Sequence, residues 1–165
     1  ADEWRSEAWA MIKERQDLSF VIETKREHRF FKALPGDWGD GYENVTILCS
    51  VEIQRRADDR IPAFLKLPVR HKGILCEPLL EKLVLDAYLK TGEIAQVLCG
   101  GEQGADARVC DFAWVLELMN QCVNCGVAFR FLRTGTFFRK GNRIYRIAEE
   151  EQEEQARRAG VDYTP

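Results

Sequence analysis

The chain has 165 residues, of which 45% are hydrophobic, so it is large enough to bury one domain-sized core. Its 24 basic and 27 acidic side chains give a formal charge of −3, and their mixing argues against a global field that attracts polyanions. No stretch approaches the ~18 consecutive apolar residues of a membrane helix, and the first thirty residues lack a signal-peptide run. We therefore expect a soluble, cytoplasmic protein without a membrane partner.

The first part of the chain alternates between helical and strand-like sequence. Residues 3–16 place apolar side chains about one helical turn apart, which predicts an amphipathic helix. The apolar run that follows predicts a strand over 20–24, and residues 27–35 again have a helical pattern that stops at a proline. Residues 36–44 contain three glycines and two aspartates, as expected of a loop.

The same alternation continues over the middle of the chain. Residues 45–51 are rich in β-branched side chains and predict a buried strand. Residues 54–68 are typical of two short helical pieces joined near Pro62, because proline suits a first helical turn. A strand is predicted over 73–77, and a helix or extended turn lies within 79–92, where Gly92 ends it.

A further strand, helix and strand follow in the third part of the chain. The strands are predicted over 95–99 and 128–133. The helix is predicted over 112–126, with Asp111 as its N-terminal cap and Gly126 after its end.

The last part of the chain predicts a β-hairpin and a charged end. Residues 136–147 alternate around a Lys-Gly-Asn turn, and the eighteen residues after them predict a surface helix and a tail. Aromatic and basic side chains interleave on the hairpin, which is one way to grip nucleic acid. An edge ribbon with one apolar face is the favoured alternative. The residues concerned are Phe137, Phe138, Arg139, Lys140, Arg143, Tyr145 and Arg146.

Five strands separated by helical sequence predict parallel βαβ units, in either an open doubly wound sheet or a β/α barrel. The strands are nearly continuous apolar runs, so we expect both faces of the sheet to be buried. In both architectures the functional site lies at the carboxyl ends of the strands. Polar or glycine-rich residues follow all five strands, although a strand must end in polar sequence for structural reasons as well.

Three similar segments, ILCSVE at 47–52, ILCEPL at 74–79 and VLCGGE at 97–102, raise the question of a metal site. Their cysteines are Cys49, Cys76 and Cys99, and their spacing resembles no common zinc or iron–sulfur motif, so core packing is favoured. Cys122 and Cys125 form a Cys-x-x-Cys pair, but at the end of a predicted helix. A redox pair normally opens a helix, so a structural role is favoured for this pair.

The glutamates beyond these cysteines are stronger candidates for function. Clustered carboxylates can bind hydroxyl groups, an amine or a metal, and basic side chains can bind an anionic substrate. A ring of ion pairs that joins the loops is an equally good interpretation. His28 and His71 fit no nucleophile or metal pattern. The acidic candidates are Glu52, Glu77 and Glu102, and the basic candidates are Lys25, Arg26, Arg108 and Arg133.

Several blocks of the chain resemble the uncharacterised, phage-associated bacterial family sometimes called three-Cys-motif proteins. That family is similar in turn to radical S-adenosylmethionine enzymes, with spore photoproduct lyase as a distant analogue. The resemblance covers roughly residues 18–135, and its Arg-Ala-Asp-x-Arg-Ile-Pro and Gly-Gly-Glu blocks are fairly specific. The blocks are ETKR (23–26), SVEIQRRADDRIPAFLKLP (50–68), HKGILCEPLL (71–80), VLCGGEQGADARVCDFAWVLELMNQC (97–122) and GVAFRFLRTG (126–135).

The resemblance implies a partial β/α barrel in which a Cys-x-x-x-Cys-x-x-Cys loop holds a [4Fe–4S] cluster. This sequence has no such triplet, and two strands expected before residue 23 are missing. By resemblance, Ser50 and Glu52 lie near the ribose of S-adenosylmethionine. Glu77 and the turn formed by Gly100, Gly101 and Glu102 border its methionyl or adenine part.

We therefore expect the C-terminal portion of a longer protein, inactive alone and without a cofactor of its own. Residues 1–135 would form the partial barrel, and residues 136–165 the hairpin, charged helix and tail. An incomplete barrel exposes strand edges and an apolar face. We expect the helix with Trp4 and Trp9 to cover part of this gap, or two copies to pair through it. The alternative is a non-catalytic nucleic-acid or protein-binding module that uses residues 136–147.

Overall fold

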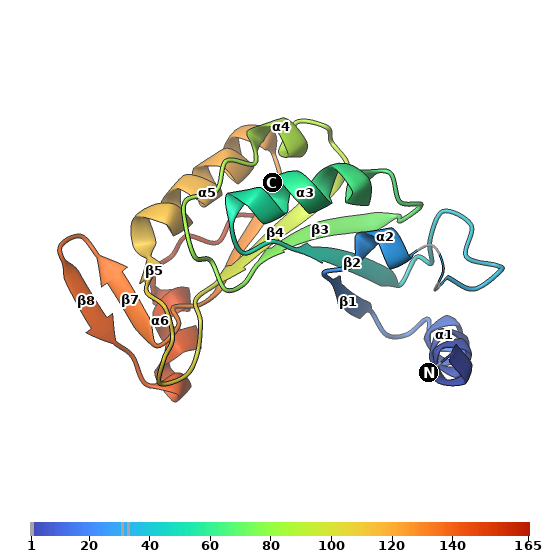
Figure 1. Ribbon diagram of the computed structural model, residues 1–165, viewed down its shortest axis with the longest axis horizontal. Helices are drawn as coiled ribbons and strands as arrows, with labels where there is room; N and C mark the ends of the chain where they lie inside the picture. Colours follow the sequence, from blue (N-terminus) through green and yellow to red (C-terminus); the bar gives the residue numbers. More distant parts are fainter. Residues whose placement is uncertain (1, 31, 33) are drawn as a thin grey trace.

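The computed structural model describes residues 2–30, 32 and 34–165 of this α/β protein (Figure 1). Its main sheet has five parallel strands in the order β1-β2-β3-β4-β6. All five predicted strands are confirmed, with small differences at their ends. Their bounds are β1 Phe20–Thr24, β2 Val45–Ser50, β3 His71–Cys76, β4 Ile94–Gly100 and β6 Ala128–Arg133.

The strand order follows the order of the chain. A doubly wound sheet turns back partway, so that alternative is wrong. Consecutive strands of a β/α barrel have this order, but the sheet of the described residues is open, with β1 and β6 at its edges. The C-terminal tail meets the β6 edge, where the backbones of Phe129 and Tyr163 exchange two hydrogen bonds. The described residues therefore form an open sheet and not a closed barrel.

The helices of the crossovers lie on one face of this sheet (Figure 1). A register row of four fully buried residues crosses this face from β2 to β6 and belongs to the same hydrophobic core as buried residues of α3 and α5. The row consists of Cys49, Ile74, Val97 and Phe129. The helices are α3 Gln54–Leu65, α4 Asp86–Leu89 and α5 Phe112–Cys125.

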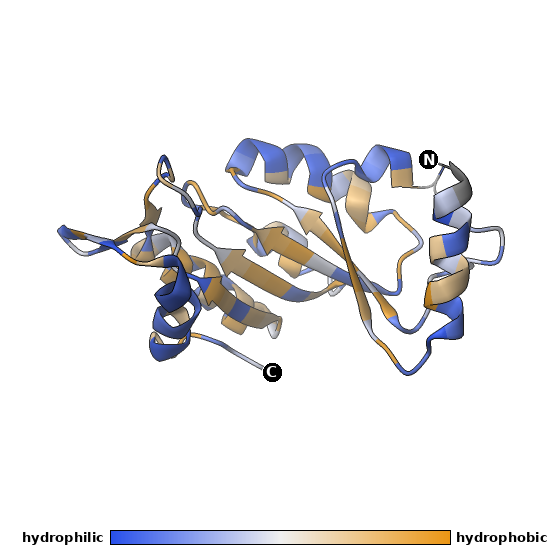
Figure 2. Cartoon of the chain, turned by 90° about the horizontal axis from the view of Figure 1, so that it is seen from below, coloured by the Kyte–Doolittle hydropathy of each residue, from blue (hydrophilic) through white to orange (hydrophobic). Residues whose placement is uncertain are grey.

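The opposite face of the sheet is buried in β2 and β3 but exposed in the edge strands, so the expectation that both faces are buried holds only for the centre of the sheet. Val21 on β1 is 60% exposed, and Arg130 on β6 is also exposed. Figure 2, which shows the molecule from below, has apolar strands with no helix drawn over the middle of the sheet. The crossovers run along one face only, because the strand order never reverses.

Residues 54–65 form one helix, not two short pieces joined at Pro62. Ala57, Ile61 and Phe64 are fully buried at one-turn spacing along this helix. Pro62 removes only one backbone donor, and the burial of this face outweighs the loss.

The segment from residue 79 to residue 92 is helical only over the short α4. Two glutamine side chains hold the preceding residues, which form neither helix nor strand. Gln121 on α5 accepts a hydrogen bond from the Leu85 nitrogen at 2.6 Å and donates to the Leu83 oxygen at 2.8 Å. Gln54 on α3 makes the equivalent pair of bonds with Val84. These long-range partners replace the local helical hydrogen bonds.

The predicted hairpin and C-terminal helix are confirmed, and a short parallel strand joins the hairpin. Phe138, Ala156 and Val161 of this region belong to the same hydrophobic core as the main sheet. The elements are β5 Cys110–Asp111, β7 Phe137–Lys140, β8 Arg143–Arg146, the 3-10 helix η2 Glu149–Glu151 and α6 Gln152–Arg158.

The predicted N-terminal helix is α1 Asp2–Glu14, at the side of the sheet in Figures 1 and 2. Trp9 is buried against Trp38, with ring centroids 5.0 Å apart, whereas Trp4 is 79% exposed. The helix predicted over 27–35 is described as the single turn α2 Glu27–Phe30, and positions 31 and 33 lie outside the described residues. None of the described helices combines the length and hydropathy needed to cross a lipid bilayer.

Candidate functional site

Polar side chains from the loops and helices meet at the carboxyl ends of β2, β3 and β4. Each of the three predicted glutamates there forms an ion pair with a basic residue. Three of the four predicted basic residues take part, namely Lys25, Arg108 and Arg133. The side chain of Arg26, directly after the end of β1, is exposed.

Glu52 lies just beyond β2 and is held between two cations. Its Oε1 atom lies 2.7 Å from Lys25 Nζ, and its Oε2 atom lies 3.1 Å from a guanidinium nitrogen of Arg60. Burial acts to raise the pKa of Glu52, but the hydrogen bond from Lys25 and the charges of Lys25 and Arg60 outweigh it, so the pKa is lowered. Glu52 is therefore a carboxylate at neutral pH.

Ser50, the last residue of β2, is fully buried. Since Cys49 faces the helices, alternation along the strand turns the Ser50 side chain to the opposite face of the sheet. Its Oγ atom has no hydrogen-bond partner among the described residues. Its backbone oxygen accepts a hydrogen bond from Arg60 at 2.5 Å. The strand end therefore contains one buried hydroxyl whose hydrogen-bonding capacity is unused.

Glu77 follows β3 and pairs with Arg133 at the end of β6. Glu77 Oε1 lies 2.7 Å from Arg133 Nε, and Arg133 also donates to the Gln103 amide oxygen at 2.5 Å. Burial raises the pKa of Glu77, and the charge of Glu23 adds to this effect while Arg133 opposes it. Of the three glutamates, Glu77 is the one whose ionised form is the least stabilised.

Glu102 is bound by Arg108 in the loop after β4. Its two oxygens accept hydrogen bonds from the Arg108 guanidinium at 2.8 and 2.6 Å, and Oε2 also accepts from the Arg108 backbone nitrogen at 2.8 Å. These bonds lower the pKa of Glu102 to about 2. The pair holds the loop in its conformation. This agrees with the interpretation of Glu102 as part of a ring of ion pairs that joins the loops.

Gly100 and Gly101 allow β4 to approach its neighbours closely. A Cβ atom on Gly100 would lie 2.4 Å from Glu77 Oε1, and one on Gly101 would lie 2.1 Å from the Thr134 carbonyl oxygen. The Gly101 nitrogen donates to the Arg133 oxygen at 3.0 Å. The glycines therefore make room for the Glu77–Arg133 pair.

The predicted site residues fall into two groups. Four of them line one shallow cavity of about 230 Å³, which Pro78 and Gln103 complete. Ser50, Glu52 and Lys25 lie at the neighbouring strand end and do not line this cavity. The four that the structure brings together are Glu77, Gly101, Glu102 and Arg133.

The three repeated cysteines lie in the hydrophobic core, which confirms the packing interpretation. Burial raises the pKa of Cys49 to about 12 and the pKa values of Cys76 and Cys99 well above their ordinary value. Cys122 is buried and Cys125 is half-buried at the C-terminal end of α5. Within the described ranges, no group of three or more His, Cys, Asp and Glu side chains is placed to hold a metal ion.

The sequence analysis did not single out Arg60, which contacts both Ser50 and Glu52. Its position on α3 did carry a signal, since it lies three residues after Ala57 and four before Phe64, both fully buried. A charged residue in the buried stripe of a helix needs an ionic partner, and Glu52 supplies it. No comparable sequence pattern predicted that Gln103 belongs to the site.

The predicted nucleic-acid hairpin uses part of its aromatic surface for packing. Phe138 is buried in the core, and Lys140 Nζ lies 5.3 Å from the ring centroid of Phe112. All four residues of β8 are exposed, including Tyr145 at 44%. The hairpin therefore presents Lys140, two arginines and one tyrosine to solvent, a smaller surface than its sequence predicts.

These features define an α/β protein whose open, singly wound parallel sheet carries paired carboxylates at its strand ends. The chain belongs to the family described as "Protein of unknown function (DUF5131)", whose sequence profile matches residues 1–163. No curated protein matches the chain significantly. The same holds for solved structures.

Proposed function

We propose that the carboxyl ends of β2, β3 and β4 bind S-adenosylmethionine as part of a radical S-adenosylmethionine-type enzyme. The observation that carries the proposal is the buried Ser50 hydroxyl, which has no hydrogen-bond partner among the described residues and lies two residues before Glu52. A buried polar atom without a partner is costly, and a bound ligand removes that cost. Residues 50–68 and 97–122 resemble the three-Cys-motif family, and the similarity of that family to radical S-adenosylmethionine enzymes names the ligand.

The carboxylate of Glu52 suits a ribose. Each of its oxygens already faces one cation, and an ionised carboxylate has about four acceptor positions. Lone pairs therefore remain for the two ribose hydroxyls, while Lys25 and Arg60 hold the side chain in place. The role of these residues is to bind and orient the cofactor.

The cysteines of this chain do not fit an iron–sulfur cluster. A cluster needs several thiolates close together, and the described residues contain no group of three or more His, Cys, Asp and Glu side chains placed to hold a metal. The proposal therefore requires cluster ligands outside these 165 residues. S-adenosylmethionine and a reduced cluster supply radical chemistry in such enzymes, and the protein provides binding and orientation.

Calorimetric titration of the chain with S-adenosylmethionine tests the proposal. Ser50→Ala should weaken binding about 2- to 12-fold, the range for one net hydrogen bond of roughly 0.5–1.5 kcal/mol. It should leave the unfolding midpoint unchanged or higher, because it removes a buried hydroxyl without a partner.

Thr46→Val is the matched control, since it removes a hydroxyl from the same face at the other end of β2. It should leave the affinity unchanged. Absence of binding by the wild-type chain, or equal weakening by both variants, would refute the assignment of this strand end.

A further inference from the structure

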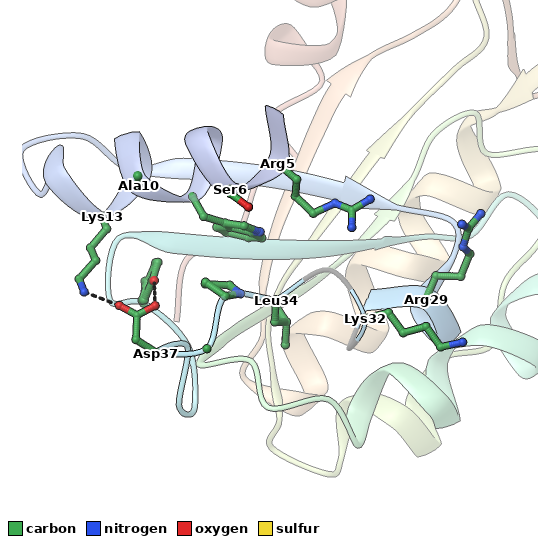
Figure 3. Close-up of a pocket in the computed structure, with 12 residues that line it drawn as sticks. Arg5, Ser6, Ala10, Lys13, Arg29, Lys32, Leu34 and Asp37 are labelled. Atoms are coloured by element: carbon green, nitrogen blue, oxygen red, sulfur yellow. Dashed lines mark hydrogen bonds and ion pairs between the residues drawn. The ribbon is translucent and has the colours of Figure 1, made fainter. Parts of the chain in front are cut away.

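A second concave surface lies between α1 and the segment that follows β1 (Figure 3). The cavity is about 780 Å³ and is lined by one side of α1 and by described residues of the segment that follows β1. We call it the basic groove. Its charged lining consists of Arg5, Lys13, Arg29, Lys32 and Asp37.

The charge of the basic groove is opposite to that of the chain. Among the described residues, four basic side chains and one acidic side chain line it, whereas the whole chain has a formal charge of −3. Lys13 pairs with Asp37, the single acid, which also accepts a hydrogen bond from Tyr42. Arg29 and Lys32 are exposed, and neither side chain has a hydrogen-bond or ion-pair partner among the described residues. Arg29 and Lys32 thus give the groove positive charge that no described acidic side chain neutralises, and this charge attracts an anion.

Packed aromatic rings hold one side of the basic groove in place. Trp9 and Tyr42 line the groove and pack edge to face, with ring centroids 6.2 Å apart. Trp38 lies behind them, 4.9 Å from Tyr42, and donates a hydrogen bond to the Pro68 oxygen at 2.6 Å. This cluster joins α1 to the start of β2 and β3, so Arg5 and Lys13 are presented from an anchored helix.

The shape of the groove favours an extended polyanion over a small molecule. Small-molecule sites are mostly apolar and enclose their ligand, but this groove is open, and half of its lining residues are charged or bear an aliphatic hydroxyl. A positively charged groove that follows the backbone is the usual arrangement for single-stranded nucleic acid. A duplex is too broad to enter a cavity of this volume.

We propose that the basic groove binds the phosphate backbone of a single strand of nucleic acid. Arg29 and Lys32 contact phosphates from one wall, and Arg5 contacts them from the facing wall on α1 (Figure 3). Arg26 is also exposed and lies just before α2, the helix that contains Arg29. This site is independent of S-adenosylmethionine binding and of the hairpin at 136–147.

Fluorescence anisotropy with a labelled oligothymidylate of about twelve nucleotides measures this binding. With about three phosphate contacts, the logarithm of the affinity should fall with the logarithm of salt with a slope of about −2. Binding should therefore weaken about 20-fold between 50 and 200 mM salt.

The decisive comparison uses two double variants that remove the same charge. Arg29→Gln with Lys32→Gln alters the groove, and Arg143→Gln with Arg146→Gln alters β8 of the hairpin. All four side chains are exposed, so circular dichroism and the unfolding midpoint should be unchanged in both variants. The groove variant should bind at least about 10-fold more weakly at 50 mM salt. The magnitude of its slope of log affinity against log salt should fall by about 1.4. The hairpin variant should stay within about 2-fold of the wild type.

Each other outcome overturns the proposal. Loss of binding only in the hairpin variant places the nucleic acid on β8, and equal loss in both variants means that diffuse charge attracts the strand. Binding to phosphatidylserine vesicles without binding to the oligonucleotide means that the groove recognises a lipid surface. Absence of any wild-type binding at 50 mM salt means that the groove has no polyanion ligand.

Discussion

Replacement of Arg133 by methionine tests how strongly the ion pair at the strand ends stabilises the fold. Arg133 Nε lies 2.7 Å from Glu77 Oε1, and the two side chains are 28% and 23% exposed. Methionine keeps most of the apolar stem but leaves the Glu77 carboxylate partly buried without its cation. Removal of one partner from a fully buried pair costs about 3–5 kcal/mol, whereas exposed pairs contribute about 0–1 kcal/mol. With this partial exposure, we expect Arg133→Met to lower the free energy of unfolding by about 2 kcal/mol at pH 7.5.

The penalty should depend on pH in a definite direction. Burial raises the pKa of Glu77 above its ordinary value of 4.5, and loss of Arg133 should raise it further. A carboxyl group whose pKa is higher in the folded chain than in the unfolded chain destabilises the folded state at pH values above the folded-state pKa. The effect disappears below the unfolded pKa, because the group is then protonated in both states. The penalty of Arg133→Met should therefore be smaller at pH 5 than at pH 7.5.

Urea unfolding followed by circular dichroism measures both values. The matched control is Arg157→Met, because Arg157 pairs with Glu154 on the surface, where the side chains are 73% and 42% exposed. It should change the free energy of unfolding by less than about 0.5 kcal/mol at either pH. Addition of Glu77→Gln to Arg133→Met should restore part of the loss. An equal penalty at both pH values, or a control as destabilised as Arg133→Met, would refute the reasoning.

Two further predictions concern packing and thiol reactivity. Gly101→Ala should lower the free energy of unfolding by about 1–3 kcal/mol, because its Cβ would lie 2.1 Å from the Thr134 oxygen. Gly36→Ala, with nothing within 4 Å, should be nearly neutral in the same thermal melts, and equal effects would contradict the steric argument. Cys125, the only half-buried cysteine, should react first with Ellman's reagent, and more than one fast thiol would contradict the core assignment. The cysteines that should react only in denaturant are Cys49, Cys76, Cys99, Cys110 and Cys122.

Local sequence patterns predicted the elements whose ends are set by nearby residues. Helix α5 begins after Asp111, which accepts a hydrogen bond from the Ala113 nitrogen at 2.9 Å, and ends at Gly126, where φ is 65°. The hairpin turns at Gly141, where φ is 61°. A cap and a left-handed glycine act within a few residues, so the sequence is sufficient to locate them.

The sequence predicted where the candidate site lies but not which of its side chains form ion pairs with one another. Residues such as Glu52, Glu77 and Glu102 follow buried strands, and parallel strands bring their carboxyl ends to one edge. Which cation meets which carboxylate depends on the loops and on the side-chain lengths. The pairing of Glu77 with Arg133, across the width of β4, has no counterpart in sequence spacing.

The sequence by itself determined five strands, most of the helices between them, the hairpin and the core position of the cysteines. These follow from hydrophobic period and local capping, which act over one or two turns of chain. Only the tertiary structure decided that the sheet is singly wound and open, that residues 79–85 are irregular, and that Arg60 joins the site. Each of these depends on partners far away in the chain, such as Gln121 for Leu85. The basic groove arises in the same way, because α1 and the segment after β1 become neighbours only when Trp9 packs against Trp38.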